Sequence, residues 1–500
     1  ASASTWGLFG RHRFAALVGS LLLDMNAEIT DFAPGHYITY GMFDPVSSID
    51  DWFHSELIFI WFSNPVYTRI PHQHYITEAR YKGSEVVTVA PDFSPSAVHA
   101  DYYVAVRPGS DAALALGMAS VVVEERLWDE AFVKDQTDLP LLVRLDSERY
   151  LRQCDVKEGG RDDQFYFWDV KAVTIAEAPR ATLALGEIDP ALEGIFTVTL
   201  KDGTRVEVTP VFELVRRRLR DYTPEKASVL CGVAPDVIRR LARKVATKRT
   251  NIISGLSNAG KYYHGDLIER AELLLLGLTG NWGRKGTGVR AWTGGFFDGS
   301  GLVQFKETRE TDPGALVAMA QQMLKALKDM DPSLNDELAN IALSKRTAQM
   351  GVGGLLMYPP AFFWYYHCGF DQIWSRQDWH DPSMKRPFAE YWREAAEKRW
   401  WQGVDLPRPE HTPRVMIEVG GNMLRRTRGG QNVLLKTLWP KLKMIVTMDP
   451  RMSTTGLYSD IVLPVAQQYE KIAFGIPSSH TMNLTFSDKV VDPPGEAKSE

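Results

Sequence analysis

The sequence predicts an α/β fold with two related Rossmann-like lobes, each a parallel sheet covered by helices. Short apolar runs alternate with segments of helical periodicity, first around residues 55–111 and again around residues 415–464. Each predicted strand ends in a polar turn, and the turns of the two regions carry similar residues in the same order. Alternating strands and helices favour a parallel sheet, and the shared order indicates two lobes of one plan.

The first region begins with a predicted buried strand at residues 56–62, followed by a helix at 71–81 and a second buried strand at 86–90. A further helix is expected at 111–125, because an Ala-rich periodic run follows Ser110, which is a suitable N-cap.

The second region predicts strands at residues 415–419, 443–448 and 460–464, with a helix at 429–439. Ligands of open α/β sheets bind beyond the carboxyl ends of the strands, where the polar turns of both regions fall. We therefore expect two nucleotide-binding lobes, although two unrelated α/β domains would show the same alternation.

Between these regions, residues 171–211 are rich in Val and Thr and contain the turn Lys201 to Thr204, which predicts a β-hairpin insertion. One helix is expected to start after Thr223 as N-cap, and another covers residues 235–244. A fresh strand is expected at 251–257.

The composition favours a globular protein that binds a small molecule. The 500 residues are 44% hydrophobic and 24% charged with a net charge of −5, so they support several cores and show no basic patch for nucleic acid or anionic membrane. The longest apolar stretches fall short of the roughly 18 to 20 residues that cross a bilayer. Cys154, Cys231 and Cys368 are far apart in sequence and are expected to be buried free thiols.

Walker, GxGxxG, GxSxG and HExxH motifs are absent. Instead, the run Ile58 to Pro65, then Thr68-Arg69 and Glu78 to Gly83, resembles the dimethyl sulfoxide reductase family of molybdopterin oxidoreductases. The likeness is to its nitrate-reductase-like branch, in which an aspartate binds the metal. Within that branch the sequence is most similar to the alpha subunits of ethylbenzene dehydrogenase and steroid side-chain dehydrogenase.

The resemblance implies that loops of both lobes hold a bis(molybdopterin guanine dinucleotide) cofactor with molybdenum. Carboxylates accept the paired N–H donors of a guanine edge, while Ser, Arg and backbone amides suit a diphosphate. Taken singly, each Asp in these loops is more commonly a helix cap or part of a surface turn. The residues expected to bind the cofactor are Ser63, Asn64, Pro65, Asp92, Gly109, Asp111, Asn258, Gly283, Gly421, Asn422, Asp449, Arg451 and Asp460.

The resemblance assigns the metal ligand to Asp31. The segment Gly19 to Gly41 is similar to the stretch that supplies this aspartate in the branch. A hard carboxylate is a sensible ligand for high-valent molybdenum that is also held by soft dithiolenes. Asp24 is the second candidate, and a loop Asp that caps a turn is the structural alternative.

A polar and aromatic cluster follows the strand expected at 251–257. Lys261 and His264 in this cluster are candidates for proton transfer, or are satisfied polar residues beside the pterin. The aromatic stretch Tyr358 to Trp374 walls an apolar substrate tunnel or forms a core. Four histidines are candidates for the substrate funnel or are placed in the core or at the surface: His12, His36, His72 and His74.

The resemblance also gives an expected division of the chain. Residues 1–50 carry the metal ligand as part of the second lobe, 51–248 form the first lobe with its β insertion, 249–480 form the second lobe with a helical insertion at about 312–401, and 481–500 begin a C-terminal domain. The family's N-terminal Cys/His motif for a [4Fe-4S] cluster and its C-terminal barrel are not found, so a segment of a larger subunit is expected.

The resemblance implies a catalytic alpha subunit that uses water, without molecular oxygen, to hydroxylate a C–H bond of a hydrocarbon or of a steroid side chain. Two alternatives use the same cofactor: reduction of nitrate, selenate, chlorate or perchlorate, and oxidation of dimethyl sulfide. A non-catalytic cofactor-binding scaffold subunit is a third. Relatives imply a heterotrimer with an iron–sulfur beta subunit and a haem b gamma subunit for anaerobic electron transfer, in the periplasm or facing the cytoplasm, with no nucleic acid and no membrane span of its own.

Overall fold

The computed structural model describes residues 10–11, 14–15, 18, 20, 34–40, 49–68, 70–179, 184–255, 259–290, 313–336, 338–340, 342–343, 361–398, 409–410, 412–427, 429–475 and 485–500. The protein forms two compact units. We call residues 30–293 the β1 unit, and residues 1–29 together with 294–500 the β12 unit.

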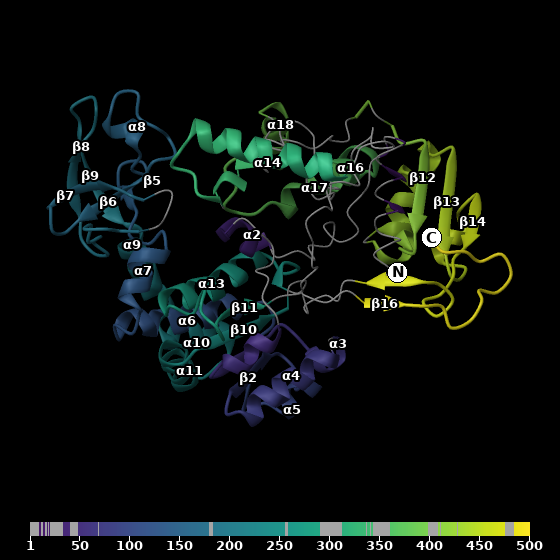
Figure 1. Ribbon diagram of the computed structural model, residues 1–500, viewed down its shortest axis with the longest axis horizontal. Helices are drawn as coiled ribbons and strands as arrows, with labels where there is room; N and C mark the ends of the chain where they lie inside the picture. The colour runs from purple at the N-terminus through teal and green to yellow at the C-terminus, as the bar shows by residue number, and fades with distance from the viewer. Residues whose placement is uncertain are drawn as a thin grey trace. The chain divides into compact units, whose positions relative to one another are not determined.

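The β1 unit contains a five-stranded parallel sheet in the order β11-β10-β1-β2-β3 (Figure 1). Its strands are β1 (Leu57–Trp61), β2 (Glu85–Ala90), β3 (Tyr102–Ala105), β10 (Thr250–Ser254) and β11 (Gly288–Arg290). Strand β1 pairs with β2 on one side and with β10 on the other. The sheet is therefore built outward from β1 in both directions, which is the doubly wound arrangement.

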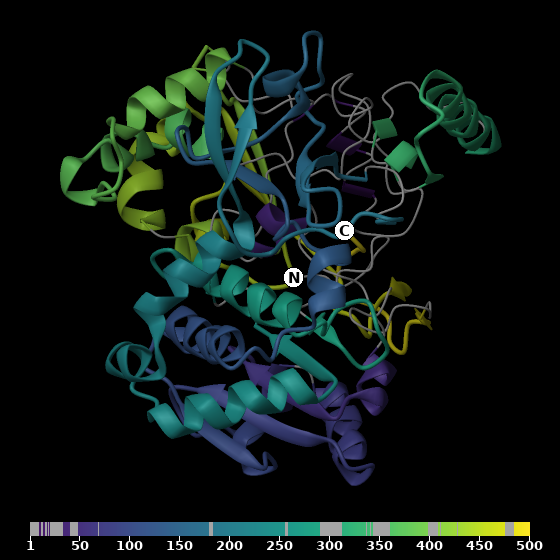
Figure 2. The ribbon, with the colours of Figure 1, turned by 90° about the vertical axis from the view of Figure 1, so that its left-hand side faces the viewer.

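Helices cover both faces of this sheet (Figures 1 and 2). Leu57, Phe59 and Trp61 of β1 point to one face, where α6 (Asp111–Glu124), α10 (Pro224–Cys231), α11 (Pro235–Thr247) and α13 (Gly265–Leu278) pack. Ile58 and Ile60 point to the other face, toward η2 (Ile49–His54) and α4 (Ile70–Tyr81). All five residues of β1 are fully buried, as expected of a parallel strand covered on both sides.

A β-rich insertion separates α6 from α10. It has a four-stranded sheet in the order β5-β4-β9-β8 and a two-stranded ribbon of β6 and β7. The strands are β4 (Leu142–Arg144), β5 (Arg149–Tyr150), β6 (Tyr166–Asp169), β7 (Thr174–Glu177), β8 (Phe196–Thr199) and β9 (Arg205–Pro210). The predicted turn joins β8 to β9, with Gly203 at φ +83° and the Leu200 N–H donating to the Thr204 carbonyl at 2.8 Å. The insertion is present, but it begins before residue 171.

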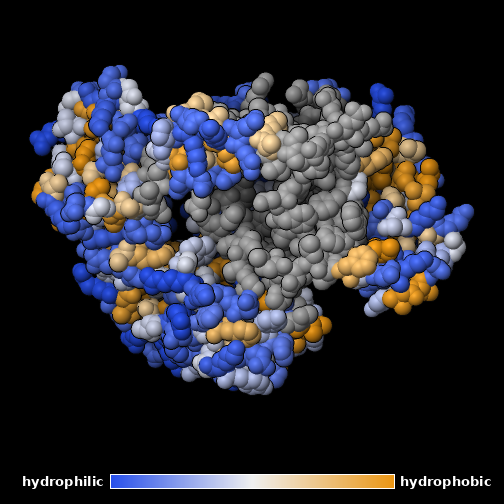
Figure 3. Space-filling model, viewed as in Figure 1, coloured by the Kyte–Doolittle hydropathy of each residue, from blue (hydrophilic) through white to orange (hydrophobic). Residues whose placement is uncertain are grey.

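The β12 unit contains a parallel sheet of β12 (Val415–Val419), β13 (Met444–Asp449) and β14 (Ile461–Pro464), and an antiparallel pair of β15 (Ala473–Gly475) and β16 (Thr485–Ser487). Val415, Ile417, Ile461 and Leu463 are exposed on the parallel strands, and hydrophobic colour gathers over this sheet in Figure 3 (right). The bounds of β12, β13 and β14 agree with those of the three predicted strands to within two residues, so these strands are confirmed.

The predicted helical insertion contains α14 (Pro313–Met330), α16 (Ala361–His367), α17 (Phe370–Trp374) and α18 (Phe388–Glu397). Phe363 and Trp364 of α16 are buried in one core with Leu434 and Leu438. The part of the aromatic stretch that the structure describes thus packs as core, which was the alternative to a substrate tunnel.

The helix expected at 429–439 is irregular. It begins as a π-helix, η6 (Gly430–Leu434), continues as α20 (Leu435–Thr437) and ends as the 3-10 turn η7 (Trp439–Lys441). Gly429 at φ +73° starts it, and Gly430 packs against the Leu424 carbonyl, where a Cβ would lie only 2.3 Å away. A close approach of this kind has no periodic signal in sequence.

The sheet pairing corrects the expected division of the chain. Strand β10 pairs along its whole length with β1, so residues 249–293 lie in the β1 unit and not in the second lobe. Residues 30–50 also belong to the β1 unit, where α2 (Pro34–Tyr40) packs on α13. Strand partners are set by contacts nearly 200 residues apart, which local patterning does not reveal. Within the described residues, no helix is long and apolar enough to cross a bilayer.

Candidate functional site

The carboxyl ends of β1 and β10 mark the point where the strand order reverses in the β1 unit. Ligands of doubly wound sheets bind in the crevice beyond such a point. The turn after β1 contains Ser63, Asn64 and Pro65, and the segment after β10 contains Lys261 and His264. The topology therefore directs five of the predicted site residues to one edge of the sheet.

Asp111, the first residue of α6, lies beneath this edge. The Trp61 indole N–H donates to Asp111 Oδ1 at 2.9 Å, and the side chain is only 2% exposed. Burial raises the pKa of Asp111 to about 6, while the Trp61 hydrogen bond and a backbone amide oppose the rise. Asp111 anchors α6 to the end of β1, and its binding of a guanine edge stays a prediction. Ser110 does not cap α6 with its side chain, because its hydroxyl donates back to the Arg107 carbonyl.

Gly109 is pressed against the segment that follows β10. It has a φ of +79°, and a Cβ there would lie 2.9 Å from the Tyr262 ring. Lys261 and His264 are exposed on that segment, and His264 holds a left-handed φ of +54° directly before α13, with its ring 4.2 Å from that of Tyr263. The loops after β3 and β10 thus touch, which only a residue without a Cβ allows.

Four candidates fall outside the described residues: Asp31, Asp24, Asn258 and His12.

A side-chain hydrogen bond joins the turns after β1 and β2. The Ser96 hydroxyl, on α5 (Pro95–Val98), donates to Asn64 Oδ1 at 2.6 Å. The Val66 N–H, at the start of α3 (Pro65–Thr68), donates to the same hydroxyl oxygen at 3.4 Å. Asp92 lies exposed in the turn between β2 and α5. Asn64 therefore fixes the shape of the crevice wall with its carbonyl and keeps its amide N–H₂ free of this bond.

The β12 unit repeats this arrangement. After β12 the backbone passes through Gly420 at φ +63° and Asn422 at φ +50° into α19 (Met423–Arg426). Asn422 Oδ1 accepts from the Thr455 N–H at 3.2 Å and from its hydroxyl at 3.3 Å. Thr455 lies on α21 (Thr454–Leu457), which follows β13. Gly421 is required beside them, because a Cβ would lie 2.7 Å from Glu418 Oε1.

The two loop pairs are equivalent by position. Asn422 follows Asn64 by 358 residues, Thr455 follows Ser96 by 359, and each pair joins the turn after one strand to the short helix after the next. The similar order of polar residues in the two regions is thus accompanied by a similar hydrogen bond in each unit.

Glu418 is a buried carboxyl that the sequence analysis missed. It is 6% exposed, its Oε1 accepts the Met423 N–H at 2.5 Å, and its Oε2 is buried without a partner among the described residues. Burial raises its pKa, the Met423 amide and Thr455 lower it, and the charge of Asp449 raises it further. A charged residue inside a predicted strand was the available signal. Glu418 holds the turn between β12 and α19.

Cationic side chains surround this edge of the β12 unit. Asp449 Oδ1 accepts the Arg451 N–H at 3.2 Å, which closes the turn after β13. The Arg451 side chain is exposed, as are those of Arg425 and Arg426 at the end of α19. Three exposed guanidinium groups beside left-handed turns are chemically suited to an anionic ligand.

Asp460 lies at the wrong end of its sheet for the predicted role. Its Oδ2 accepts the Ile445 N–H at 2.8 Å, at the amino end of β13. Asp101 makes the same bond to the Val86 N–H at 2.9 Å in the β1 unit. These equivalent aspartates fasten the start of one strand to the start of the next, so Asp460 is corrected from a cofactor residue to a structural one.

Gly283 is corrected for the same reason. Helix α13 runs back along the sheet, so the loop after it returns to the amino ends of the strands. There Asn281 Oδ1 accepts the Thr250 N–H at 2.8 Å, and the Ser55 hydroxyl donates to the Gly286 carbonyl at 2.9 Å. Gly283 is exposed at this edge, opposite the crevice.

The described histidines of the predicted funnel are dispersed. His36 is fully buried on α2, whereas His72 and His74 lie on α4, where the His72 ring meets Trp52 edge-on at 6.2 Å. Helix α4 covers the face of the sheet away from α13, so the structure does not gather these residues at one site.

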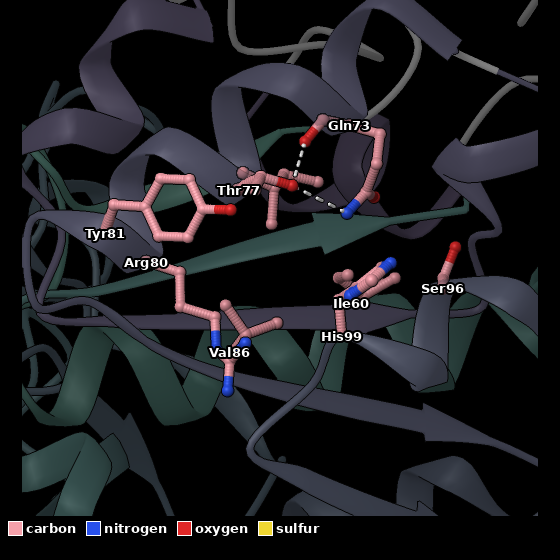
Figure 4. Close-up of a pocket in the computed structure, with 9 residues that line it drawn as sticks. Ile60, Gln73, Thr77, Arg80, Tyr81, Val86, Ser96 and His99 are labelled. Atoms are coloured by element: carbon pink, nitrogen blue, oxygen red, sulfur yellow. Dashed lines mark hydrogen bonds between the residues drawn. The ribbon is translucent and has the colours of Figure 1, made fainter.

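A cavity of about 70 Å³ lies between α4 and the sheet, lined by Gln73, Thr77, Arg80 and Ser96 among others (Figure 4). Gln73 and Thr77 lie side by side on α4 and are hydrogen-bonded to each other. This volume suits a few water molecules and is far below the several hundred Å³ of a typical ligand site. This cavity is therefore too small to be the predicted nucleotide site.

The polar groups at the two carboxyl edges are chemically suited to an anionic ligand. In the described part of the chain, no three His, Cys, Asp or Glu side groups converge on a metal position. Ser254, at the end of β10, is 4% exposed, and its hydroxyl acts on the buried Glu272 carboxyl of α13. The left-handed turns and exposed arginines are chemically suited to a ligand rich in phosphate.

A doubly wound sheet in the β1 unit, together with the same polar loop pair in both units, defines an α/β protein of the kind that binds ligands beyond the carboxyl ends of its strands. The chain belongs to the molybdopterin oxidoreductase family, whose model matches residues 2–500. It is 35% identical to the perchlorate reductase subunit alpha of Dechloromonas aromatica, over 98% of this chain and 50% of that one. It is 32% identical to the dimethylsulfide dehydrogenase subunit alpha of Rhodovulum sulfidophilum, over 98% and 49%.

The chain spans about half the length of these curated relatives. Among solved structures, acetylene hydratase from Pelobacter acetylenicus is similar with a TM-score of 0.54 and 19% identity, over all of this chain and 52% of that one. This likeness confirms the predicted α/β fold. The family assignment implies a molybdenum–molybdopterin cofactor.

Proposed function

We propose that this protein is part of the catalytic alpha subunit of a molybdenum oxidoreductase that binds a bis(molybdopterin guanine dinucleotide) cofactor. The observation that carries this is the repeated loop pair, Asn64 with Ser96 and Asn422 with Thr455, at the carboxyl edges of both sheets. We call each loop pair, Asn64 with Ser96 and Asn422 with Thr455, a cradle. Two equivalent cradles match a cofactor with two chemically identical nucleotide arms.

The residues of each cradle have distinct tasks in this proposal. Asn64 and Asn422 shape the two turns by accepting hydrogen bonds from the neighbouring helix. We assign Arg451 the task of neutralising a diphosphate and Asp92 that of accepting guanine N–H donors, because both are exposed just after a strand of their sheet. Asp31 would bind the metal by the resemblance. Bound molybdenum would supply two-electron redox chemistry coupled to oxygen-atom transfer.

The proposed reaction is reduction of an oxyanion or oxidation of dimethyl sulfide. The relatives named perchlorate reductase and dimethylsulfide dehydrogenase support this choice. The preference for hydrocarbon hydroxylation depended partly on an aromatic tunnel, and Phe363 and Trp364 pack instead in a core. Hydroxylation therefore becomes the second candidate, supported by the exposed Lys261 to His264 segment beside the crevice.

By the same similarity, we propose a [4Fe-4S] cluster elsewhere in the full subunit, an iron–sulfur beta subunit, a haem b gamma subunit and a periplasmic location. Co-purification and cell fractionation of the native complex test these four points. A non-catalytic scaffold would copurify in the same way but would hold no molybdenum.

The first experiment is metal analysis and guanine-nucleotide release on the intact purified subunit, with Asp31→Ala and Asn422→Ala beside it. We expect about one molybdenum with two guanine nucleotides, inactivity of Asp31→Ala, and partial nucleotide loss in Asn422→Ala. Asp460→Ala is the matched control, since that residue lies at the opposite edge of the sheet. Turnover with oxyanions, dimethyl sulfide and hydrocarbons then separates the reactions. An intact subunit without molybdenum would overturn the proposal.

A further inference from the structure

A buried carboxyl on α13 holds the start of α2. Glu269 is 1% exposed, and its Oε2 accepts the Gly35 N–H at 2.7 Å. The His36 N–H also acts on this carboxyl. Both amides belong to the first turn of α2, so one carboxylate of α13 satisfies two backbone donors of another helix.

The contact between the two helices leaves no spare room. A Cβ on Gly35 would lie 2.3 Å from the Asp266 carbonyl oxygen and 2.9 Å from Glu269 Oε2. His36, the next residue, is fully buried. Gly35 is therefore a close-approach glycine, and α2 is seated on α13 by its backbone.

Helix α2 begins three residues after Asp31. Three residues span at most about 10 Å, so a fixed helix start restricts where this aspartate can reach. Helix α13 itself begins at the carboxyl edge of the sheet, directly after His264. We call the contact of α2 with α13 the seat of α2. Because α13 begins at the carboxyl edge of the sheet, this contact is linked to that edge through α13.

The charged groups around Glu269 are mostly carboxyls. Asp266 and Glu272 are on the same helix, α13, and His36 is on α2, while the charge of Asp111 on α6 acts on Glu272. Burial raises the pKa of Glu269 to about 7, and the Asp266 charge adds to this, while the two α2 amides lower it. Burial, followed by the charges of Glu269 and Asp111, raises the pKa of Glu272 well above its usual value.

Glu272 is fully buried, and neither of its carboxyl oxygens has a hydrogen-bond partner in the described part of the chain. The Ser254 hydroxyl lowers the pKa of Glu272, against the stronger effect of burial. Burial thus disfavours a charge on Glu272, whereas on Glu269 two backbone amides stabilise the charged form.

We propose that Glu269 is a positioning residue, which seats α2 on α13 and through α2 fixes the segment that carries Asp31. This rests on the proposed function, because the family resemblance gives Asp31 its role. Glu269 itself need not touch the cofactor.

The seat has a defined pH dependence. Opening α2 exposes Glu269 to water and returns its pKa to the ordinary range, so the closed seat binds the proton more tightly. Its stability is complete below the ordinary pKa and falls as the pH rises through about 7. The population of opened α2 should therefore grow by about 100-fold between about pH 5 and about pH 8.

Amide hydrogen exchange of residues 34–40 in the intact holoenzyme tests this, after correction for the intrinsic rate at each pH. Glu269→Gln keeps the acceptor for Gly35 without the charge, so its seat should be independent of pH. Glu269→Ala loses the acceptor and should open about tenfold more than Glu269→Gln at every pH. Glu272→Gln, on the same helix but without a hydrogen bond to the described residues of α2, is the matched control.

The second readout is the Mo(V) electron paramagnetic resonance signal of the loaded enzyme. Glu269→Ala should alter it, whereas Glu269→Gln and Glu272→Gln should retain it near neutral pH. Unchanged exchange in Glu269→Ala would overturn the seat, and changed exchange with an unchanged signal would overturn the link to Asp31. Absence of molybdenum from the wild type would instead refute the proposed function, and with it the positioning role.

Discussion

The buried Trp61–Asp111 contact predicts that Asp111→Asn changes how the stability of the β1 unit depends on pH. Folding raises the pKa of Asp111 from 3.8 to about 6, because burial disfavours its charge. The folded state therefore holds the proton more tightly. Stability is complete below about pH 4 and is lost as the pH rises through about 6.

The size of this loss follows from the pKa change. At about pH 8 the ionised carboxyl costs about 3 kcal/mol relative to about pH 4, since each pKa unit corresponds to about 1.4 kcal/mol. Asparagine keeps an Oδ1 acceptor for the Trp61 N–H but never ionises. Any constant cost of its amide N–H₂ cancels when one variant is compared with itself at two pH values.

Core amides of α6 exchange only when this helix detaches from the sheet, so their exchange reports the relevant free energy. We expect wild type to lose about 3 kcal/mol more than Asp111→Asn between about pH 4 and about pH 8. Glu269 titrates in both proteins and cancels from the difference, and the Glu272→Gln substitution made in both backgrounds removes the coupling of Glu272 to the Asp111 charge. Trp61→Phe is the complementary variant, because loss of the donor should steepen the wild-type dependence. Parallel pH profiles for wild type and Asp111→Asn would refute the reasoning.

Three further predictions concern the loops. Asn422→Ala should lower the local stability of α21 by about 1 to 2 kcal/mol, because the Thr455 N–H loses its acceptor, and Asn64→Ala should likewise weaken the attachment of Ser96 on α5. Amide hydrogen exchange of α21 and of α5 measures the two effects, and unchanged protection in either variant would contradict its prediction. Asp460→Ala should destabilise β13 by about 1 to 2 kcal/mol in thermal unfolding while the nucleotide content stays at the wild-type level, so nucleotide loss would restore it to the cofactor site. Gly109→Ala should lower the free energy of unfolding by about 1 to 2 kcal/mol for the left-handed backbone alone, and its Cβ should displace the Tyr262 ring at a further cost. The double variant with Tyr262→Ala should recover only the steric part of this loss, and full recovery would show that the backbone is not strained.

Strands β1, β2, β12, β13 and β14 were predictable because apolar runs between polar turns have few other structures. The partner of β10 was not, since the pairing of Leu57 with Thr250 depends on the closing of a loop of nearly 200 residues. Gly283 was assigned from the family resemblance, which does not show that α13 returns the chain to the amino ends of the strands before this loop.

The repeated loop residues were found because their order survives in both regions. Asp460 was misassigned because an aspartate beside a strand looks the same at either end of a sheet, and only the Ile445 amide shows which end it occupies. Glu269 and Glu272 left a signal that was not used: they lie on the apolar stripe of α13 with Ile268 and Leu276, where buried residues are expected. An acid on such a stripe indicates a buried contact.

Because the loops of the β1 unit and the β12 unit are equivalent by position, the charges at matching positions of the two cradles can be compared. Two residues after β2 stands Asp92, and two residues after β13 stands Arg451, both exposed. If two identical nucleotide arms bind, one meets a carboxylate where the other meets a guanidinium, so the arms are held by different forces. Salt screens an ionic contact more than a neutral hydrogen bond. The arm beside Arg451 would then be the first to dissociate as ionic strength rises, which would give a symmetric ligand a fixed order of release.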